Sequence, residues 1–159
     1  MMQYSVKPEE GKVLTTAVRR ATLSTGDLSS WLTETYSRIY ANLADHGNHP
    51  IGAPFARYHR IATGRYDVEA GFPVSSPVEF GGDVYPSALP GGLVATTVHT
   101  GRFQDVGPAY RAVSSWITEH DGQGCGDPWE VYLSSPQLMT DPASWQTEVH
   151  QPYEQRTSI

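Results

Sequence analysis

The feature that most constrains this chain is an internal repeat. Residues 11–18 read Gly-Lys-Val-Leu-Thr-Thr-Ala-Val, and residues 91–98 read Gly-Gly-Leu-Val-Ala-Thr-Thr-Val. Runs of this composition predict strands. Gly-Ala-Pro-Phe-Ala-Arg-Tyr at 52–58 is matched by Gly-Asp-Pro-Trp-Glu-Val-Tyr at 126–132, with Gly, Pro, an aromatic residue and Tyr in register. A last pair of segments, near Asp67-Val-Glu and Gln146-Thr-Glu, shares a Glu and a later Pro.

Each half also carries one amphipathic segment. Apolar residues recur at helical spacing between residues 28 and 43, and again between residues 106 and 117. Asp27 is placed to cap the first predicted helix, and Pro108 falls in the first turn of the second, where its missing N–H costs nothing.

The order strand–helix–strand–strand therefore occurs twice, which predicts an α+β fold. We expect a single domain over residues 1–159, with repeat one at about 11–74, a Gly-, Pro- and Ser-rich crossover at about 75–90 and repeat two at about 91–153. Because such a half is small for an independent core, we expect the two sheets to join, antiparallel, about a pseudo-two-fold axis. Both helices are expected to lie on one face.

Charge and cysteine content exclude several classes of function. The formal net charge is −6, from 17 acidic and 11 basic residues, so a basic nucleic-acid footprint is absent. Cys125 is the only cysteine, which excludes an intrachain disulfide and a thiolate metal cluster. The chain has no long apolar run and no signal-peptide pattern, so we expect a soluble cytoplasmic protein. His46 and His49 form a weak metal signal, and we expect neither metal nor cofactor.

Three segments of the second half carry a family resemblance. They are Val98-His-Thr-Gly-Arg-Phe, Pro128-Trp-Glu-Val-Tyr-Leu and Thr147-Glu-Val-His-Gln-Pro. Together they resemble the GyrI-like small-molecule-binding family, whose domain is also the effector-binding half of many AraC- and MerR-type transcription activators. The first half matches the family's first repeat more loosely.

The resemblance implies a cleft between the repeats that binds bulky, apolar and often cationic compounds, with Glu130 as its acidic residue. It also implies a second activity, because some stand-alone members resemble hydrolases that open strained cyclopropane rings of DNA-alkylating antibiotics. The 159 residues leave no room for a helix-turn-helix beside the duplicated domain, so we expect no direct nucleic-acid binding.

The segment around Glu130 predicts where chemistry can occur. Side chains alternate along a strand, so Glu130 and Tyr132 share one face. Trp129, Val131 and Leu133 share the other face, which we expect to pack under the helices. A carboxylate beside aromatic rings needs water, a hydrogen bond or a cation, and this arrangement suits a cationic or polarised ligand.

The repeat extends the candidate site to the first half. Ala56 is the counterpart of Glu130, and Tyr58 is the counterpart of Tyr132, so the acid occurs on one side only. The predicted ligand-binding residues are Glu130, Tyr132, Tyr58, Ala56, Trp31 and Tyr66. The alternatives are a solvent-facing Glu130 and ordinary sheet packing of the tyrosines. The aromatic residues of the second helix, Tyr110 and Trp116, are interpreted mainly as core.

Two functions are left open. The first is multidrug-type binding of a hydrophobic, preferably cationic small molecule, as effector or toxin. The second is cyclopropane hydrolysis for antibiotic resistance, with Glu130 as general base on a water and Tyr132 or Tyr58 as hydrogen-bond donor to a carbonyl conjugated to the ring. Both need an acid whose pKa is raised by apolar surroundings, so the sequence does not separate them. The sequence is also compatible with a homodimer.

Overall fold

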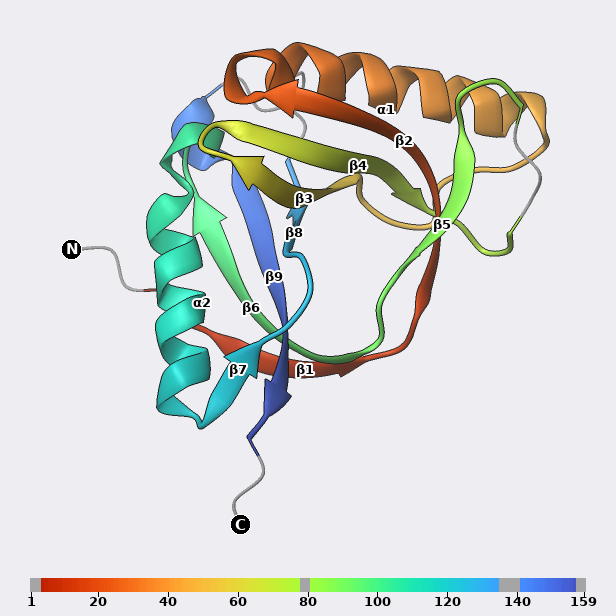
Figure 1. Ribbon diagram of the computed structural model, residues 1–159. Helices are drawn as coiled ribbons and strands as arrows, with labels where there is room; N and C mark the ends of the chain where they lie inside the picture. The colour runs from red at the N-terminus through yellow and green to blue at the C-terminus, as the bar shows by residue number, and fades with distance from the viewer. Residues whose placement is uncertain (1–3, 78–80, 135–140, 157–159) are drawn as a thin grey trace. The chain divides into compact units, whose positions relative to one another are not determined.

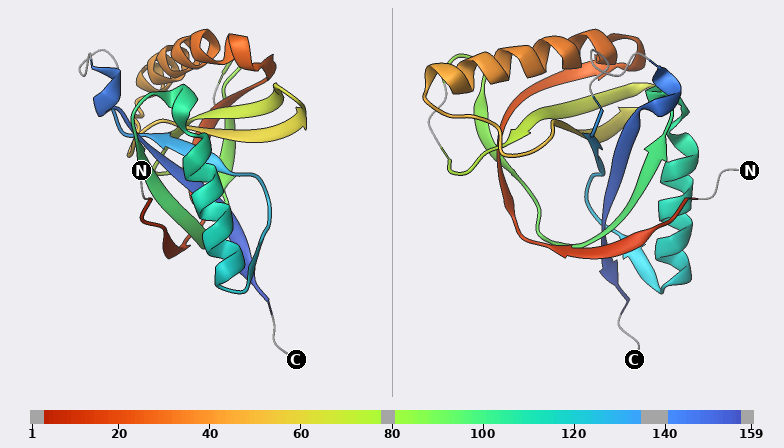
Figure 2. Two further views of the ribbon diagram at one scale, coloured as in Figure 1. Left: turned by 90° about the vertical axis from the view of Figure 1, so that its left-hand side faces the viewer. Right: turned by 180° about the vertical axis from the view of Figure 1, so that it is seen from behind.

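The computed structural model describes residues 4–77, 81–134 and 141–156. The chain forms two compact units: the first unit comprises residues 13–90, and the second unit comprises residues 1–12 and 91–159. In each unit one long α-helix lies against an antiparallel sheet (Figures 1 and 2). The predicted α+β class and the duplicated strand–helix–strand–strand order are therefore confirmed.

The first unit contains β2 (Leu14–Ser24), α1 (Leu28–Asp45), β3 (Phe55–Ala62), β4 (Arg65–Pro73) and β5 (Tyr85–Leu89). Its strands lie in the order β3-β4-β2-β5, and neighbouring strands are antiparallel.

The second unit contains β1 (Lys7–Gly11), β6 (Gly92–Thr100), α2 (Gly107–Glu119), β7 (Gly122–Gly124), β8 (Trp129–Tyr132) and β9 (Gln146–Gln155). Its strands lie in the order β1-β6-β9-β8, and β7 pairs with the last residues of β9. Because β9 is bonded to β6 on one side and to β8 on the other, it holds the centre of this sheet.

The outermost strand of each unit lies, in the sequence, just before the repeat of the other unit. β1 precedes the first repeat in sequence but pairs with β6, whereas β5 precedes the second repeat but pairs with β2. The predicted crossover therefore contributes a strand to the first unit. Both outermost strands carry a proline, Pro8 and Pro86, and edge strands tolerate a residue that cannot donate a backbone hydrogen bond.

Both helices bury side chains at the same spacing. The buried residues are Thr35, Ile39 and Leu43 in α1 and Ala109, Val113 and Ile117 in α2. Residues four apart lie on one helical face, so each helix presents a single stripe to its sheet. Asp27 directly precedes α1 as predicted, but its carboxylate accepts a hydrogen bond from Ser24 and does not cap the helix.

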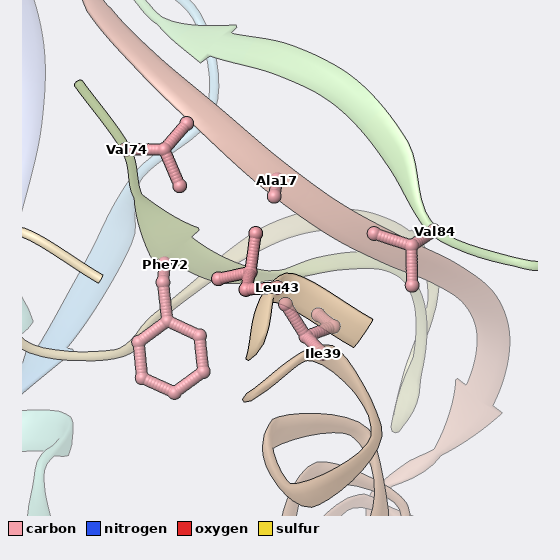
Figure 3. Close-up of a cluster of buried hydrophobic side chains, with 6 residues drawn as sticks. All are labelled: Ala17, Ile39, Leu43, Phe72, Val74 and Val84. Carbon is pink, nitrogen blue, oxygen red and sulfur yellow. The ribbon is translucent and has the colours of Figure 1, made fainter. Parts of the chain in front are cut away.

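The crossover completes the core of the first unit. Figure 3 shows the cluster formed by Ala17, Ile39, Leu43, Phe72, Val74 and Val84. Next to Val84, Asp83 accepts hydrogen bonds from Arg19 Nε at 2.8 Å and Arg38 Nη1 at 3.0 Å. Partial burial opposes its ionisation, but the two guanidinium groups hold the pKa of Asp83 below its ordinary value. These contacts fasten the crossover to β2 and α1.

The second unit has a core of its own, formed by Ala95, Ala109, Val113, Ile117, Val149 and Tyr153. It packs β6 and β9 against α2. Within the described ranges, no helix is long and apolar enough to cross a membrane.

Gly71 of β4 provides a test of the close packing in the first unit. A Cβ at this position would collide with the backbone carbonyl of Ala17 on β2. We expect Gly71→Ala to lower the free energy of unfolding by about 3 kcal/mol, at the upper end of the usual cost of overpacking. Urea denaturation followed by circular dichroism measures this. Gly81→Ala is the control, because a Cβ there meets nothing within 4 Å, and an equal loss in both variants would contradict the packing.

Candidate functional site

Glu130 and Tyr132 lie on the same face of β8, as the strand alternation predicts, and this face packs under α2. Glu130 is directly opposite Val149 of β9 in the sheet. Val149 belongs to the core that contacts α2. Since paired residues of neighbouring strands point to the same side, Glu130 faces the helix.

The prediction that Trp129, Val131 and Leu133 pack under the helix is therefore wrong. Trp129 lies on the opposite face, where its ring stacks on that of His150 with centroids 5.2 Å apart. Leu133 follows β8 and is exposed. The apolar triplet indicates the alternation of the strand correctly, but the helix covers the face that carries the carboxylate.

The Glu130 carboxylate is buried and bonded at both oxygens. The residue is 8% exposed. The Tyr110 hydroxyl of α2 donates to Oε2 at 2.5 Å, and the Tyr132 hydroxyl donates to Oε1 at 3.0 Å. Among the described residues, no lysine or arginine forms an ion pair with Glu130. Its two hydrogen-bond donors are thus neutral groups.

Burial dominates the protonation of this group. Desolvation raises the pKa of Glu130 above its ordinary value of 4.5. The hydrogen bonds from Tyr110 and Tyr132, and the electrostatic influence of His99, oppose that shift without cancelling it. A positive charge placed beside the carboxylate would favour the ionised form.

His99 of β6 is fully buried on the same side of the sheet. Its Nε2 lies 2.9 Å from the carbonyl oxygen of Arg102, and its Nδ1 lies 2.9 Å from the Tyr4 hydroxyl. Because a carbonyl only accepts, Nε2 carries a hydrogen that it donates to Arg102. Both ring nitrogens of His99 therefore have a hydrogen-bond partner.

Aromatic rings flank the bonded pair. The Phe103 ring lies 5.4 Å from that of Tyr132, and it stacks on Trp145 at 4.7 Å with an interplanar angle of 22°. The sequence reasoning missed both residues, since Phe103 belongs to a short 3-10 turn (Phe103–Asp105) and Trp145 directly precedes β9. Neither position has the periodicity that marks a strand or helix face.

The other predicted ligand-binding residues belong to the first unit. Ala56 and Tyr58 of β3 and Tyr66 of β4 lie on the face that α1 covers, as their pairing with residues of β2 and β4 indicates. Ala56 is fully buried, and the rings of Tyr58 and Tyr66 meet edge to face at 5.9 Å. Trp31 of α1 lies under the guanidinium of Arg19, 5.6 Å from the ring centroid. That these four residues contact the same ligand as Glu130 stays a prediction.

The second unit also contains a cavity of about 380 Å³ alongside α2. The helix contributes Tyr110, Val113, Ser114, Ile117 and Thr118 to its wall. Tyr110, interpreted from sequence mainly as core, therefore has three roles: its ring packs on the core, borders this cavity and carries the hydroxyl that bonds Glu130. The sequence feature that corresponds to this cavity is the glycine-rich segment after α2, which has the same composition as an ordinary loop.

The histidine pair noted in the sequence is formed by His46 and His49, and His46 Nδ1 lies 2.8 Å from the carbonyl oxygen of Asn42. Across the described ranges, no group of three or more His, Cys, Asp or Glu side chains is placed to hold a metal ion.

Tyr110→Phe tests how the carboxylate is held. A pKa of Glu130 above 4.5 in the folded protein means that its contribution to stability is complete below pH 4.5 and is lost as the pH rises to the folded-state pKa. The Tyr110 hydroxyl favours the ionised carboxylate, so its removal raises the pKa of Glu130 further and the loss of stability continues to higher pH. Once the carboxylate is ionised, the variant should be about 1.5–3 kcal/mol less stable than wild type. Urea denaturation between pH 4 and 8 measures the profile.

Two variants control that experiment. Glu130→Gln has no carboxylate at this position, so this part of the pH dependence should vanish. Tyr40→Phe removes the hydroxyl of an exposed tyrosine on α1 and should leave the profile unchanged. Superimposable profiles for wild type and Tyr110→Phe would contradict the importance of the bond.

Comparisons with known proteins show the family and the fold of this chain. The family model described as GyrI-like small molecule binding domain matches residues 19–154. The search of curated proteins gives no match. Among solved structures, the C-terminal domain of EcmrR is similar with a TM-score of 0.82 and 20% identity, covering 98% of this chain and 100% of that chain. In the EcmrR–DNA complex, the chain spans 59% of the EcmrR chain.

Two further structures share the fold at low identity. A hydrolase from Listeria innocua has a TM-score of 0.66 and 9% identity, covering 94% of this chain and 91% of that chain. SAV2435 bound to tetraphenylphosphonium has a TM-score of 0.61 and 12% identity, covering 96% and 94%. Because the family model matches most of its length, this chain belongs to the GyrI-like small-molecule-binding domain family.

Proposed function

We propose that the chain binds bulky, hydrophobic organic cations beside Glu130. The observation that carries the proposal is the buried carboxylate that accepts hydrogen bonds from two neutral hydroxyls and has no cationic partner among the described side chains. An ionised carboxylate in such surroundings is costly unless a positive charge accompanies it. A ligand cation supplies that charge.

The neighbouring rings favour a large apolar cation over a metal ion. Tyr132, Phe103 and Trp145 form a continuous series of ring contacts that begins at the carboxylate. Aromatic faces attract a delocalised cation by about 0.5–2 kcal/mol each, depending on how dry the site is. One acid among aromatic side chains is also the usual composition of a small-molecule site.

A structural neighbour supports the choice of ligand class. SAV2435 was solved with tetraphenylphosphonium, a large aromatic cation that has no hydrogen-bond donor. The complex of this neighbour, which shares 12% identity with the chain, makes tetraphenylphosphonium a suitable probe. The proposal also extends to Ala56, Tyr58, Tyr66 and Trp31 of the first unit as further ligand contacts, for which Tyr58→Ala is the first variant to titrate.

Calorimetric titration with tetraphenylphosphonium tests the proposal. Glu130→Gln removes the negative charge and should raise the Kd at least tenfold, which corresponds to about 1.4 kcal/mol. Triphenylphosphine oxide serves as the neutral probe, and its affinity should be nearly unchanged. Glu148→Gln is the matched control, because Glu148 lies on the opposite face of the same sheet and pairs with His150. An equal loss of affinity for both ligands in Glu130→Gln would contradict the proposal.

A hydrolase is the second candidate function, and the carboxyl group itself favours it. A raised pKa makes the Glu130 carboxylate a stronger base than an exposed one, and a tyrosine hydroxyl lies 3.0 Å from it. Glu130 would take a proton from a water whose oxygen attacks a carbon of a cyclopropane ring. The electrons of the broken ring bond would move to a conjugated carbonyl, with Tyr132 donating a hydrogen bond to its oxygen. One structural neighbour is described as a hydrolase.

Mass spectrometry separates the two candidates. The protein is incubated with a cyclopropane-containing alkylator, and the products are searched for a ring-opened species that has gained one water. Turnover beyond one equivalent that is lost in Glu130→Gln is the result expected of the hydrolase. Tight binding with no product beyond the uncatalysed background assigns the protein to binding alone.

A further inference from the structure

The cavity alongside α2 has two chemically different ends. At one end Tyr110 lines it, and the hydroxyl of this residue is bonded to Glu130. At the other end Arg156 lines it, just beyond β9, where its backbone N–H donates to the carbonyl of Asp121 at 2.9 Å. Between Tyr110 and Thr118 the helix rises about 12 Å, at 1.5 Å per residue. The wall of the cavity thus includes Tyr110, whose hydroxyl bonds Glu130, and the guanidinium-bearing Arg156.

The long walls of the cavity suit a flat, partly apolar molecule. Val113 and Ile117 supply apolar surface from α2, and Gln123 and Gln151 supply polar groups from the opposite side. Three glycines, at positions 122, 124 and 126, keep that side free of bulk. At Gly124 a Cβ would lie in ordinary van der Waals contact with the Gln151 side chain, at 3.7 Å, without a clash.

Arg156 is an exposed residue of the cavity wall and the one charged side chain among the described residues that line it. In the part of the chain that the structure describes, it forms no ion pair, although the protein carries a formal net charge of −6. The C-terminal end of α2 would repel an anion through its free carbonyl groups. The carbonyls of His120 and Asp121, which directly follow the helix, accept hydrogen bonds from Gln155 Nε2 at 2.6 and 3.2 Å. Within the cavity wall, the guanidinium is the group that attracts an anion.

We propose that this cavity is a second compartment of the binding site, which takes the anionic end of a zwitterionic aromatic ligand whose cationic end lies beside Glu130. The inference rests on the proposed function and narrows its ligand class. A carboxylate suits the compartment because a guanidinium can bind both of its oxygens through parallel N–H donors. The negative charge of the ligand would then lie beside Arg156, and its positive charge beside Glu130 across Tyr110.

Rhodamine B and its ethyl ester form a matched pair of probes. Both carry the same delocalised cation, but only rhodamine B carries a free carboxylate. We expect Arg156→Gln to raise the Kd of rhodamine B about tenfold and to leave that of the ester unchanged, as measured by fluorescence anisotropy. Arg111→Gln is the matched control, since Arg111 is an exposed arginine of α2 that does not line the cavity.

A second variant tests the compartment without changing any charge. Gly124→Val places two methyl groups in the cavity and should also weaken rhodamine B about tenfold. Gly11→Val is its control, because Gly11 is an exposed strand glycine of the same unit with nothing within 4 Å of an added Cβ. Circular dichroism of each variant shows whether it is folded.

The outcomes distinguish the inference from the proposed function. If neither dye binds, or if Glu130→Gln affects neither, the cation site is wrong and the compartment fails with it. If Glu130→Gln weakens both dyes but Arg156→Gln changes both equally or neither, the cation site stands and the anionic compartment is overturned. A loss confined to rhodamine B in both Arg156→Gln and Gly124→Val supports the compartment.

Discussion

A buried carboxylate between two phenol hydroxyls is the interaction on which this site depends. The oxygens of Glu130 accept one bond from Tyr110 of α2 and one from Tyr132 of β8, so the residue ties the helix to β8. Both donors are neutral. They satisfy the hydrogen-bonding capacity of the carboxylate only in part and leave its charge unmatched, which is the basis of the proposed cation site.

The packing of α2 determines where that interaction forms. Ala109 and Val113 face the sheet, and residue 110 lies about 100° further around a helix with 3.6 residues per turn. The side chain of Tyr110 is therefore directed along the sheet surface and reaches Glu130, whose position β9 defines by pairing with β8. The same side chain borders the cavity, so the carboxylate and the cavity are neighbours because one helix residue serves both.

Sequence patterns predicted the repeated architecture and half of the site. The matched segments that end in Tyr58 and Tyr132 correspond to β3 and β8, and Glu130 and Tyr132 share a face as alternation requires. The choice of face was wrong, because alternation reports that two faces differ but not which one a helix will cover. Tyr110 was missed because an aromatic residue on an amphipathic helix has the same pattern whether its hydroxyl is bonded or exposed.

Local composition by itself determined the elements of this protein: strands where Val and Thr recur, helices where apolar residues repeat every three or four positions, and a single acid in one of two matched segments. Those properties depend on side-chain spacing along the backbone, which the sequence states directly. The tertiary structure alone decided that α2 lies over Glu130, that β1 pairs with β6 and β5 with β2, and that Arg156 and Thr118 border the same cavity. Each of these depends on contacts between residues far apart in the chain. Such contacts are selected by the burial of apolar surface, and no periodic pattern in the sequence indicates them.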